Sequence, residues 1–532
     1  MILNTATEAF PMLLGSSKLG LVLVVLLLLP STTLVLWRLW AFTIKPILHP
    51  SEPKELPYWI PWLGHAIEYI KNGQRVITKA RLYFHDSREP FALTLGGEKL
   101  YFLTAPEDVV MLYRNTESLA FDRIVHELGI TFGVSRLAMD AVYRPPVDDS
   151  DDAPAQVMAI KNPKRKSLAH LNNDFWKQQL VPGQHYYDLQ DKFFTLLTDS
   201  LRPERVRSGG AYVRARNTDG SFTVSLQEWT REVLIDAAVR VFFGHKLLDM
   251  SPDLITDFVA FDEHNWKLWY KWPNATDMFA AKSRLASAIE RWLCLSDEER
   301  GECSFIVATM ISTQRAIGMS DKDLAKVLCM VVFVTNTNTP RVCFWSLAYL
   351  FHSRELPSRV YEEIESAMAK DSTKEKLSFL MDSSPWLAGL FHETLRLCSA
   401  SSSIRLVTAP TKIGGKILPV GSRVIVPFRQ MHFDERVFGG DIEAFHPERF
   451  VENKGLVNST SYRPFGGGIS YCPGRFIARQ EVCVFIALLL KGYQTELVGD
   501  RKFPKLDAGK PTTGLMDAKI GEEVLLKLTP RS

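Results

Sequence analysis

Cysteine is scarce in this chain of 532 residues, and the first 293 residues contain none. The number of cysteines is odd, and no two of them form a Cys-x-x-Cys pair. A disulfide scaffold or a zinc site would need cysteines that are paired or clustered. The pattern therefore argues against both and is typical of a reducing compartment. The seven residues are Cys294, Cys303, Cys329, Cys343, Cys398, Cys472 and Cys483.

An excess of charge of either sign is also missing. The 63 Lys and Arg residues and the 60 Asp and Glu residues leave a net charge of +3. A nearly balanced chain gives no support to nucleic acid as a partner. The basic run at residues 161–166 is interpreted as a solvated surface segment, with docking of an acidic reductase domain as the alternative. Gly/Ser linkers, internal repeats and low-complexity tracts are absent from the sequence as well.

The longest uncharged run lies near the N-terminus, at residues 19–37. As a helix it would span about 28 Å, close to the hydrocarbon thickness of a bilayer. No Ala-x-Ala-like site follows it, which argues against a cleaved signal peptide. Arg38 and Lys45 do follow it. The positive-inside rule therefore predicts a single-pass membrane anchor with the larger, C-terminal side in the cytosol.

The remaining boundaries follow from this anchor. Residues 1–18 are predicted to be a short lumenal N-terminus. Residues 38–64 contain five prolines and are predicted to form a stiff hinge, because proline favours extended backbone. Residues 65–532 are predicted to form one large domain.

This domain is predicted to be mainly α with small β-sheets. Helical periodicity recurs at residues 225–243, 278–295, 321–351 and 385–398. Strand-like stretches are fewer: residues 91–103 are typical of a hairpin around two glycines, and residues 524–528 of a short strand.

The most informative residue is Cys472, in the stretch Phe465-Gly-Gly-Gly-Ile-Ser-Tyr-Cys472-Pro-Gly474. Glycines allow backbone conformations closed to other residues and let the main chain approach a bulky ligand. Backbone N–H groups in such a turn, and the N-terminus of the apolar helix predicted to follow, favour a thiolate. A thiolate on a rigid turn suits axial ligation of haem iron. The alternative is a structural cysteine beside a tight turn.

The pattern Phe-x-x-Gly-x-x-x-Cys-x-Gly resembles the haem-binding loop of the cytochromes P-450, the haem-thiolate monooxygenases. Three further motifs stand in that family's order. Glu393-Thr-Leu-Arg396 resembles its Glu-x-x-Arg helix motif, and Pro447-Glu-Arg449-Phe450 resembles the segment that completes the same ion-pair network. Residues 57–64 resemble the proline-rich hinge behind a membrane anchor. The resemblance implies a single cytochrome P-450-type domain behind a transmembrane helix.

The resemblance also implies haem b as the cofactor. It assigns cofactor-binding roles to five residues, with Cys472 as the metal ligand, Arg405 against a haem propionate, and Phe465, Gly468 and Gly474 in the loop. Two departures weaken the usual propionate anchoring. Ser470 stands where the wider family has arginine or histidine, and no arginine follows Trp176 at the usual spacing.

Glu393, Arg396 and Arg449 are predicted to form a structural network. A buried arginine between a carboxylate and main-chain acceptors would lock a helix to a loop through bidentate bonds. We therefore expect these three residues to serve folding and haem retention, not chemistry.

The helix predicted from residue 321 contains a turn that resembles the family's oxygen-activation turn but departs from its usual sequence. Asn338 stands where most members have an acid, and Thr339 follows it. Pro340 has no backbone N–H and is predicted to open the helix one turn earlier. By resemblance, Asn338 and Thr339 are the catalytic residues that order protons for dioxygen. The alternative is an irregular kink without a catalytic role.

The run Asn-Thr-x-x-x-x-Phe-Trp from residue 338 resembles the branch of sterol 7-alpha-hydroxylase, sterol 12-alpha-hydroxylase and prostacyclin synthase. It implies a bulky lipophilic substrate, such as a sterol or triterpenoid. The predicted substrate contacts are residues 121–137, 334–339, 401–403 and 514–516. The aromatic cluster at residues 266–272 is interpreted either as a membrane-facing rim of the substrate channel or as ordinary core.

The resulting functional hypothesis is a monooxygenase of the endoplasmic reticulum membrane that takes NADPH electrons from a flavoprotein reductase. Two alternatives remain open. The missing acid at position 338 is compatible with a haem-thiolate isomerase or dehydratase that needs neither oxygen nor reductase. A non-catalytic haem or sterol carrier is the second.

Overall fold

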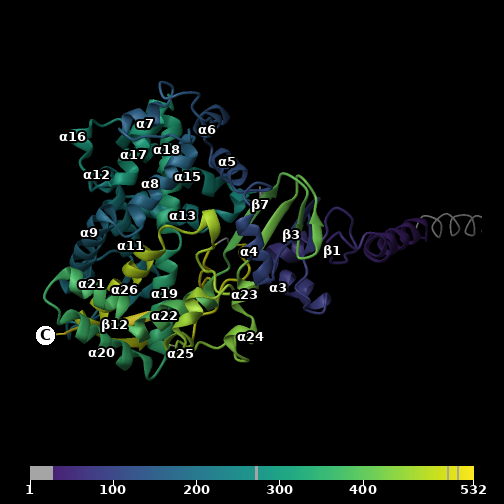
Figure 1. The fold of residues 1–532 in the computed structure, drawn as a ribbon. Helices are drawn as coiled ribbons and strands as arrows, with labels where there is room; N and C mark the ends of the chain where they lie inside the picture. The colour runs from purple at the N-terminus through teal and green to yellow at the C-terminus, as the bar shows by residue number, and fades with distance from the viewer. Residues whose placement is uncertain (1–27, 270–273, 500–501, 512–513, 532) are drawn as a thin grey trace, which may run out of the picture.

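The computed structural model describes residues 28–269, 274–499, 502–511 and 514–531. Figure 1 shows most helices gathered into one body, with the largest sheet between that body and the N-terminal helix. The described chain is mainly helical, and its strands form small sheets of six, four and two strands. The predicted fold class is therefore confirmed.

The helical body is built from long segments whose apolar faces pack on one another. The longer helices are α3 (Ala66–Tyr83), α8 (Leu168–Leu180), α9 (Gln184–Ser200), α11 (Leu226–Phe243), α13 (Leu254–Asp262), α15 (Thr276–Leu293), α17 (Phe305–Ala316), α18 (Asp321–Asn336), α19 (Thr339–His352), α20 (Leu356–Met368), α21 (Thr373–Asp382), α22 (Pro385–Cys398) and α26 (Arg475–Gly492). Shorter ones include α4 (Pro106–Arg114), α5 (Asp122–Thr131), α6 (Arg136–Tyr143), α7 (Ala153–Val157), α14 (Trp266–Trp269), α23 (Arg429–His432), α24 (Glu435–Phe438) and α25 (Glu448–Glu452).

The six-stranded sheet has the order β1-β2-β3-β10-β7-β4. Its central strands β3 and β10 run parallel, whereas β10 and β7 are antiparallel, with Val424 opposite Arg405. The strands are β1 (Lys54–Glu55), β2 (Phe91–Leu95), β3 (Glu98–Phe102), β4 (Leu119–Ala120), β7 (Ser402–Val407) and β10 (Arg423–Pro427). The predicted hairpin is confirmed as β2 and β3, with Gly96 and Gly97 in left-handed conformations at its turn.

The four-stranded sheet, β11-β12-β6-β5, closes the opposite side of the helical body. Its strands are β5 (Val213–Arg216), β6 (Phe222–Ser225), β11 (Tyr493–Val498) and β12 (Leu525–Pro530), and a separate pair consists of β8 (Thr411–Ile413) and β9 (Lys416–Leu418). The strand predicted at residues 524–528 is β12.

The largest hydrophobic cluster of the described residues is centred on α19, which packs against α11, α22 and α26. Trp229, Trp292 and Trp345 are fully buried in it. Burial of such large aromatic side chains contributes on the order of 2–3 kcal/mol each. The cluster fixes α19 against α26. A predicted site residue lies at the start of each helix: Thr339 at α19 and Gly474 directly before α26.

The long helix expected from residue 321 is interrupted, as Pro340 predicts. α18 ends at Asn336, α19 begins at Thr339, and Pro340 is near the start of α19. Among the described residues, only the α18–α19 run is long and apolar enough to cross a membrane, and 67% of its most apolar window is buried inside the protein. It is therefore a core helix.

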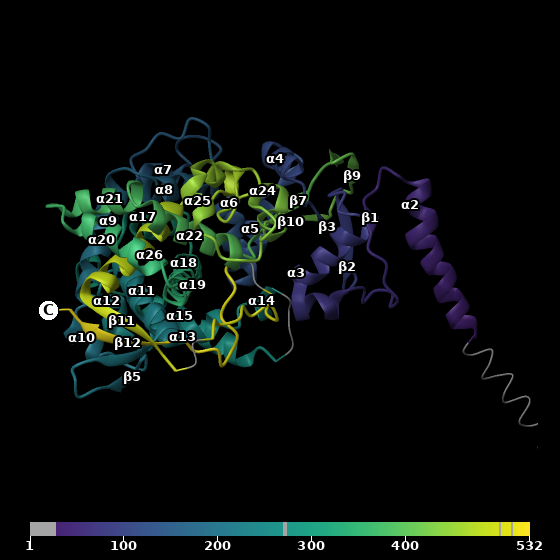
Figure 2. The ribbon, with the colours of Figure 1, turned by 90° about the horizontal axis from the view of Figure 1, so that it is seen from below.

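The N-terminal part of the chain projects away from the body as a helix (Figure 2). Residues 28–39 are helical and continue through η1 (Trp40–Ile44) and α2 (Lys45–Leu48). Leu29 and Leu36 are 66% and 60% exposed. The predicted anchor at residues 19–37 lies partly outside the described residues, so this exposed apolar helix represents only its second half.

Candidate active site

Cys472 lies on a short loop between η3 (Gly468–Ser470) and the start of α26. Its backbone N–H donates to the Phe465 carbonyl at 3.0 Å, which closes the loop. Gly466 and Gly468 have φ of +78° and +59°, a region that favours glycine. A Cβ atom on Gly468 would stand 2.8 Å from the Tyr113 ring. Glycine at this position therefore serves both the turn and the close packing of α4.

Burial raises the pKa of the Cys472 thiol, while backbone N–H groups of Gly474 and Arg475 and the Arg475 charge oppose that rise. The main-chain N–H groups at the N-terminus of α26 therefore favour the charged form of the sulfur, as the glycine turn suggests. Those donors are insufficient to ionise a buried thiol by themselves. A bound metal cation would supply the missing positive charge, because a coordinating thiol is deprotonated outright.

Arg405 reaches from β7 to the cysteine loop. Its Nη2 donates to the Ser470 hydroxyl at 2.7 Å, and its Nη1 donates to the Ser403 hydroxyl at 2.9 Å. The residue is 2% exposed, and burial lowers the pKa of its guanidinium. Among the described residues Arg405 forms no ion pair. A buried cation without a carboxylate partner is costly, so this position fits an anionic group carried by a ligand.

A second arginine and a phenol lie beside Arg405, and sequence reasoning missed both. The guanidinium groups of Arg405 and Arg463 each lie 5.5 Å from the centre of the Tyr113 ring. Burial lowers the pKa of Arg463, which likewise has no ion pair in the described part of the chain. The Tyr113 hydroxyl is buried and finds no hydrogen-bond partner there. The loop therefore offers a thiol together with two uncompensated cations, a donor set that fits a metal cofactor bearing carboxylates.

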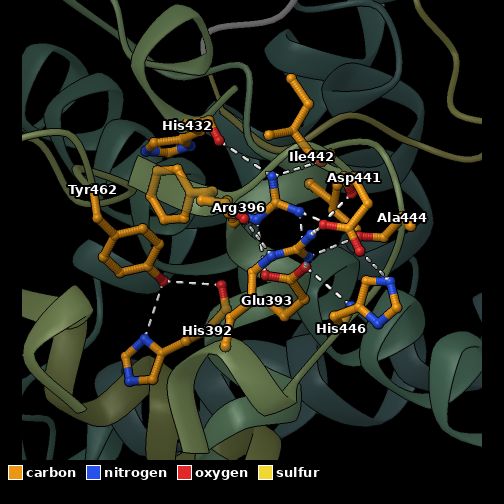
Figure 3. A network of polar contacts seen from close by, with 12 residues as sticks. His392, Glu393, Arg396, His432, Asp441, Ile442, Ala444, His446 and Tyr462 are labelled. Atoms are coloured by element: carbon orange, nitrogen blue, oxygen red, sulfur yellow. Dashed lines mark hydrogen bonds and ion pairs between the residues drawn. The ribbon is translucent and has the colours of Figure 1, made fainter. Parts of the chain in front are cut away.

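Glu393 forms ion pairs with both Arg396 and Arg449. Figure 3 shows Glu393 and Arg396 at the centre of this network. Arg396 binds the Glu393 carboxylate through Nε at 2.8 Å and Nη2 at 2.7 Å, and Arg449 Nη1 reaches the same carboxylate at 2.6 Å. Glu393 and Arg396 are both 0% exposed. The pair spans one turn of α22, so the helix itself sets its register.

The remaining donors of Arg396 bind main-chain carbonyls. Arg396 Nη1 donates to Ile442 at 2.7 Å and to His432 at 3.2 Å, and Nη2 donates to Ala444 at 3.3 Å. His432 also accepts the Arg463 backbone N–H at its Nε2. This network therefore joins α22 to the segment that leads into the cysteine loop.

At the helix break, Asn338 faces the C-terminal segment. Its Oδ1 accepts the Leu515 backbone N–H at 3.0 Å and would stand 2.2 Å from a Cβ atom on Gly514. Thr339 is 7% exposed, and within the described residues its hydroxyl has no hydrogen-bond partner. An unpaired hydroxyl of this kind is available to a water or a ligand.

The four predicted substrate segments lie close together. Residues 334–339 meet residues 514–516 at Asn338, and the Gly514 carbonyl accepts the N–H of Ala400, next to residues 401–403. In the segment 121–137, Phe121 lies under the Arg405 guanidinium at 4.6 Å and Phe132 packs on Phe333 at 5.5 Å. These contacts arise from residues far apart in the sequence.

Only part of the aromatic cluster at residues 266–272 belongs to the described residues. Residues 270–272 lie outside the described residues. Trp269 packs on Phe132 at 5.7 Å and donates from its indole nitrogen to Asn265 at 3.2 Å. This tryptophan is therefore part of the core.

Residues 290–520 match the family model for cytochrome P-450. The chain is 26% identical to the cytochrome P-450 monooxygenase poxD of Penicillium oxalicum, over 86% of this chain and 90% of that protein. It is 25% identical to the human 7-alpha-hydroxycholest-4-en-3-one 12-alpha-hydroxylase, over 90% of this chain and 94% of that protein. Beta-amyrin 11-oxidase of Glycyrrhiza uralensis is 25% identical over 56% of this chain and 62% of that protein.

These matches and the cysteine-loop geometry define an oxygen-incorporating oxidoreductase of the haem-thiolate class. The chain is similar to the cytochrome P-450 family over residues 290–520 and to monooxygenases of that family along most of its length. Members of this family ligate haem iron through a cysteine thiolate and receive electrons from a reductase.

Proposed function

We propose that the chain is a membrane-anchored monooxygenase that oxidises a bulky polycyclic lipid, such as a sterol or triterpenoid. The observation that carries this proposal is the arrangement of the broken helix. Asn338 and Thr339 at the start of α19 are joined to residues 514–516, next to the small serines 401–403. The names of the relatives support the substrate class, because one acts on a cholestenone and another on beta-amyrin.

Several residues of the chain would bind haem, each at a different part of the cofactor. Cys472 would hold the iron of haem b, with Arg405 on a propionate and Phe465, Gly468 and Gly474 shaping the loop. We add Arg463 and Tyr113 to this set, because they lie beside Arg405. In the described part of the chain Arg463 has no ion pair and the Tyr113 hydroxyl has no hydrogen-bond partner. They would replace the anchoring that Ser470 and the residues after Trp176 do not supply.

Bound haem supplies oxygen activation, and the protein controls substrate position and protons. The Thr339 hydroxyl can both donate and accept a hydrogen bond, so it would order water in the helix opening. Asn338 cannot ionise. Its amide, held by the Leu515 N–H, would fix the wall of the opening instead of delivering a proton.

Electrons would come from NADPH through a flavoprotein reductase in the endoplasmic reticulum membrane. The exposed apolar helix at residues 28–39 supports membrane attachment, and Arg38 near its end and Lys45 after it support a cytosolic catalytic domain.

The test compares Thr339→Ala with the unchanged chain, reconstituted with reductase, NADPH and a panel of sterols and triterpenoids. Loss of an ordered proton path should lower product formed per NADPH by about tenfold to a hundredfold and release peroxide. Substrate-induced spectral shifts should persist, because the change leaves the cysteine loop intact. Thr198→Ala on α9 is a matched control, since its hydroxyl donates only to its own helix, at the Phe194 carbonyl.

Turnover by Thr339→Ala that is unchanged, and equally fast without NADPH, would instead identify a haem-thiolate isomerase. Substrate-induced shifts without turnover of any lipid would indicate a carrier. Cys472→Ser serves as the reference for complete loss of the thiolate spectrum of the reduced carbon-monoxide complex.

A further inference from the structure

A second buried charge cluster lies at the helix break. Arg341 Nη2 bonds Asp262 at the end of α13 at 2.6 Å and Asp517 at 2.9 Å. Arg341 and Asp517 are 8% and 9% exposed. Arg231 on α11 extends the cluster by bonding Asp517 at 3.2 Å and Glu263 at 2.8 Å. Charges in such a setting are retained only where they are paired.

The local backbone explains why an arginine follows Pro340. A proline has no N–H, so the helix ladder is interrupted and carbonyls of the preceding turn lose donors. Arg341 turns back and donates from its Nη1 to the Thr337 carbonyl at 2.7 Å. The side chain therefore caps the opened turn while its other nitrogen holds two carboxylates.

The same carboxylates fix the walls of the opening. The Thr337 hydroxyl donates to Asp262 Oδ1 at 3.0 Å, which ties α13 to the break. On the other side, Trp345 donates from its indole nitrogen to the Met516 carbonyl at 2.8 Å, next to Asp517. The charges of Arg341 and Arg231 lower the pKa of Asp517 to about 2, against the effect of its burial. The residues 515–517 are thus anchored to α19 by an ionised carboxylate.

The cluster is not completely satisfied. In the described part of the chain, Arg341 Nε and Asn336 Oδ1 are buried and have no hydrogen-bond partner. Two small open cavities, of about 20 Å³ and 10 Å³, are both lined by Asp262 and Arg341. Unpaired polar atoms beside such space allow water to enter and the contacts to exchange.

We propose that Arg341 is a positioning residue that latches α13 and residues 515–517 onto the open turn of the broken helix. By holding Thr337 and the Asn338–Leu515 contact in place, the latch keeps the opening in the geometry that lipid oxidation needs. This inference rests on the proposed function of residues 334–339 and 514–516 as substrate walls.

Two variants separate the latch from simple folding. Arg341→Met keeps the apolar stem of the side chain but leaves the buried Asp262 without its cation and Asp517 with Arg231 alone, so it loses stability as well as the latch. The triple variant Arg341→Met, Asp262→Asn, Asp517→Asn removes the charges together and leaves none of the three stranded. Arg231 then keeps Glu263 as a partner. Arg284→Met is the matched control, because Arg284 pairs with Asp257 on the outer side of the same helix α13 and is 58% exposed.

The first measurement is amide hydrogen exchange of the holoprotein, which needs no substrate. In the triple variant, exchange at residues 336–342 and 514–518 should be at least about tenfold faster, with residues 385–398 unchanged. The second measurement is product per NADPH, which should fall several-fold while the carbon-monoxide spectrum stays normal. Arg341→Lys keeps the charge but not the forked donors. Its hydrogen exchange and its product per NADPH should therefore lie between those of Arg341→Met and those of the unchanged chain.

Unchanged exchange at both segments in the triple variant would overturn the latch. Failure of the triple variant to hold haem would also overturn it, because the cluster would then be a folding element. If exchange accelerates as expected but no lipid is oxidised even by the unchanged chain, the latch stands and the proposed substrate class fails.

Discussion

The two buried charge networks differ in how completely the guanidinium group at the centre of each is bonded. Around Arg396, every guanidinium nitrogen has an acceptor, and both Arg396 and Glu393 are fully buried. Around Arg341, the Nε nitrogen has no hydrogen-bond partner in the described part of the chain, and two cavities adjoin the cluster. A fully satisfied network favours one arrangement, whereas a partly satisfied one has alternatives of similar energy. We infer that the first network fixes the segment that leads into the cysteine loop, and that the second holds the helix opening with fewer bonds.

The largest expected effect is on the satisfied network. Arg396→Met leaves the buried Glu393 carboxylate without its main partner and should destabilise the fold by about 3–5 kcal/mol. We expect almost no holoprotein, measured by the reduced carbon-monoxide spectrum of purified material. Arg202→Met should be close to neutral, because Arg202 and its partner Asp199 are 63% and 43% exposed. A normal spectrum for Arg396→Met would remove the distinction between the networks.

Arg449→Met should have a smaller effect. Its side chain is 10% exposed and one of its partners, Asp441, is 58% exposed, while Glu393 keeps Arg396. We expect about 1–3 kcal/mol, the usual result of losing charged hydrogen bonds. Thermal loss of the spectrum measures it, and a double-mutant cycle with Glu393→Gln isolates the pair. An effect as large as that of Arg396→Met would show that both arginines carry the network equally.

The smallest effect is a pH dependence at the edge of the satisfied network. Burial, with the charges of Arg396 and Arg429, lowers the pKa of His432 from 6.5 to about 3. Between these values the unfolded chain binds a proton and the folded chain does not. The contribution of His432 to the free energy of unfolding is therefore full above about pH 6.5 and falls by about 1.4 kcal/mol per pH unit below it.

His432→Gln keeps an acceptor for the Arg463 N–H without titrating, so it should flatten this slope. Urea unfolding between pH 7 and pH 5 measures the difference. His392, whose pKa burial likewise lowers to about 3, should preserve part of the slope and is the internal reference. An identical slope in His432→Gln would mean that His432 is protonated equally in both states.

Elements set by local patterns could be predicted from the sequence. α22 begins and ends at the residues that its periodicity indicates, and α11 begins one residue later than expected. The break before α19 follows from one missing N–H at Pro340. The pairing of Glu393 with Arg396 is also local, because the two residues are one turn apart.

Contacts between distant segments could not be predicted without the resemblance. Arg341 meets a carboxylate 79 residues earlier, and Arg405 meets a serine 65 residues later. Nothing in the spacing identifies such partners. An arginine within an otherwise apolar helix was the available signal for the latch. Tyr113 carried no signal, because a tyrosine at the end of an amphipathic helix is ordinary.

The order of partners along the chain has a consequence for synthesis on the ribosome. Arg396 depends on carbonyls 36 to 48 residues further on. At about 5–20 residues per second, this arginine waits on the order of several seconds for its acceptors. Arg341 can meet Asp262 at once but must wait longer for Asp517, which follows every partner of Arg396 in the sequence. We therefore expect the nascent chain to secure the support of the cysteine loop before it closes the latch.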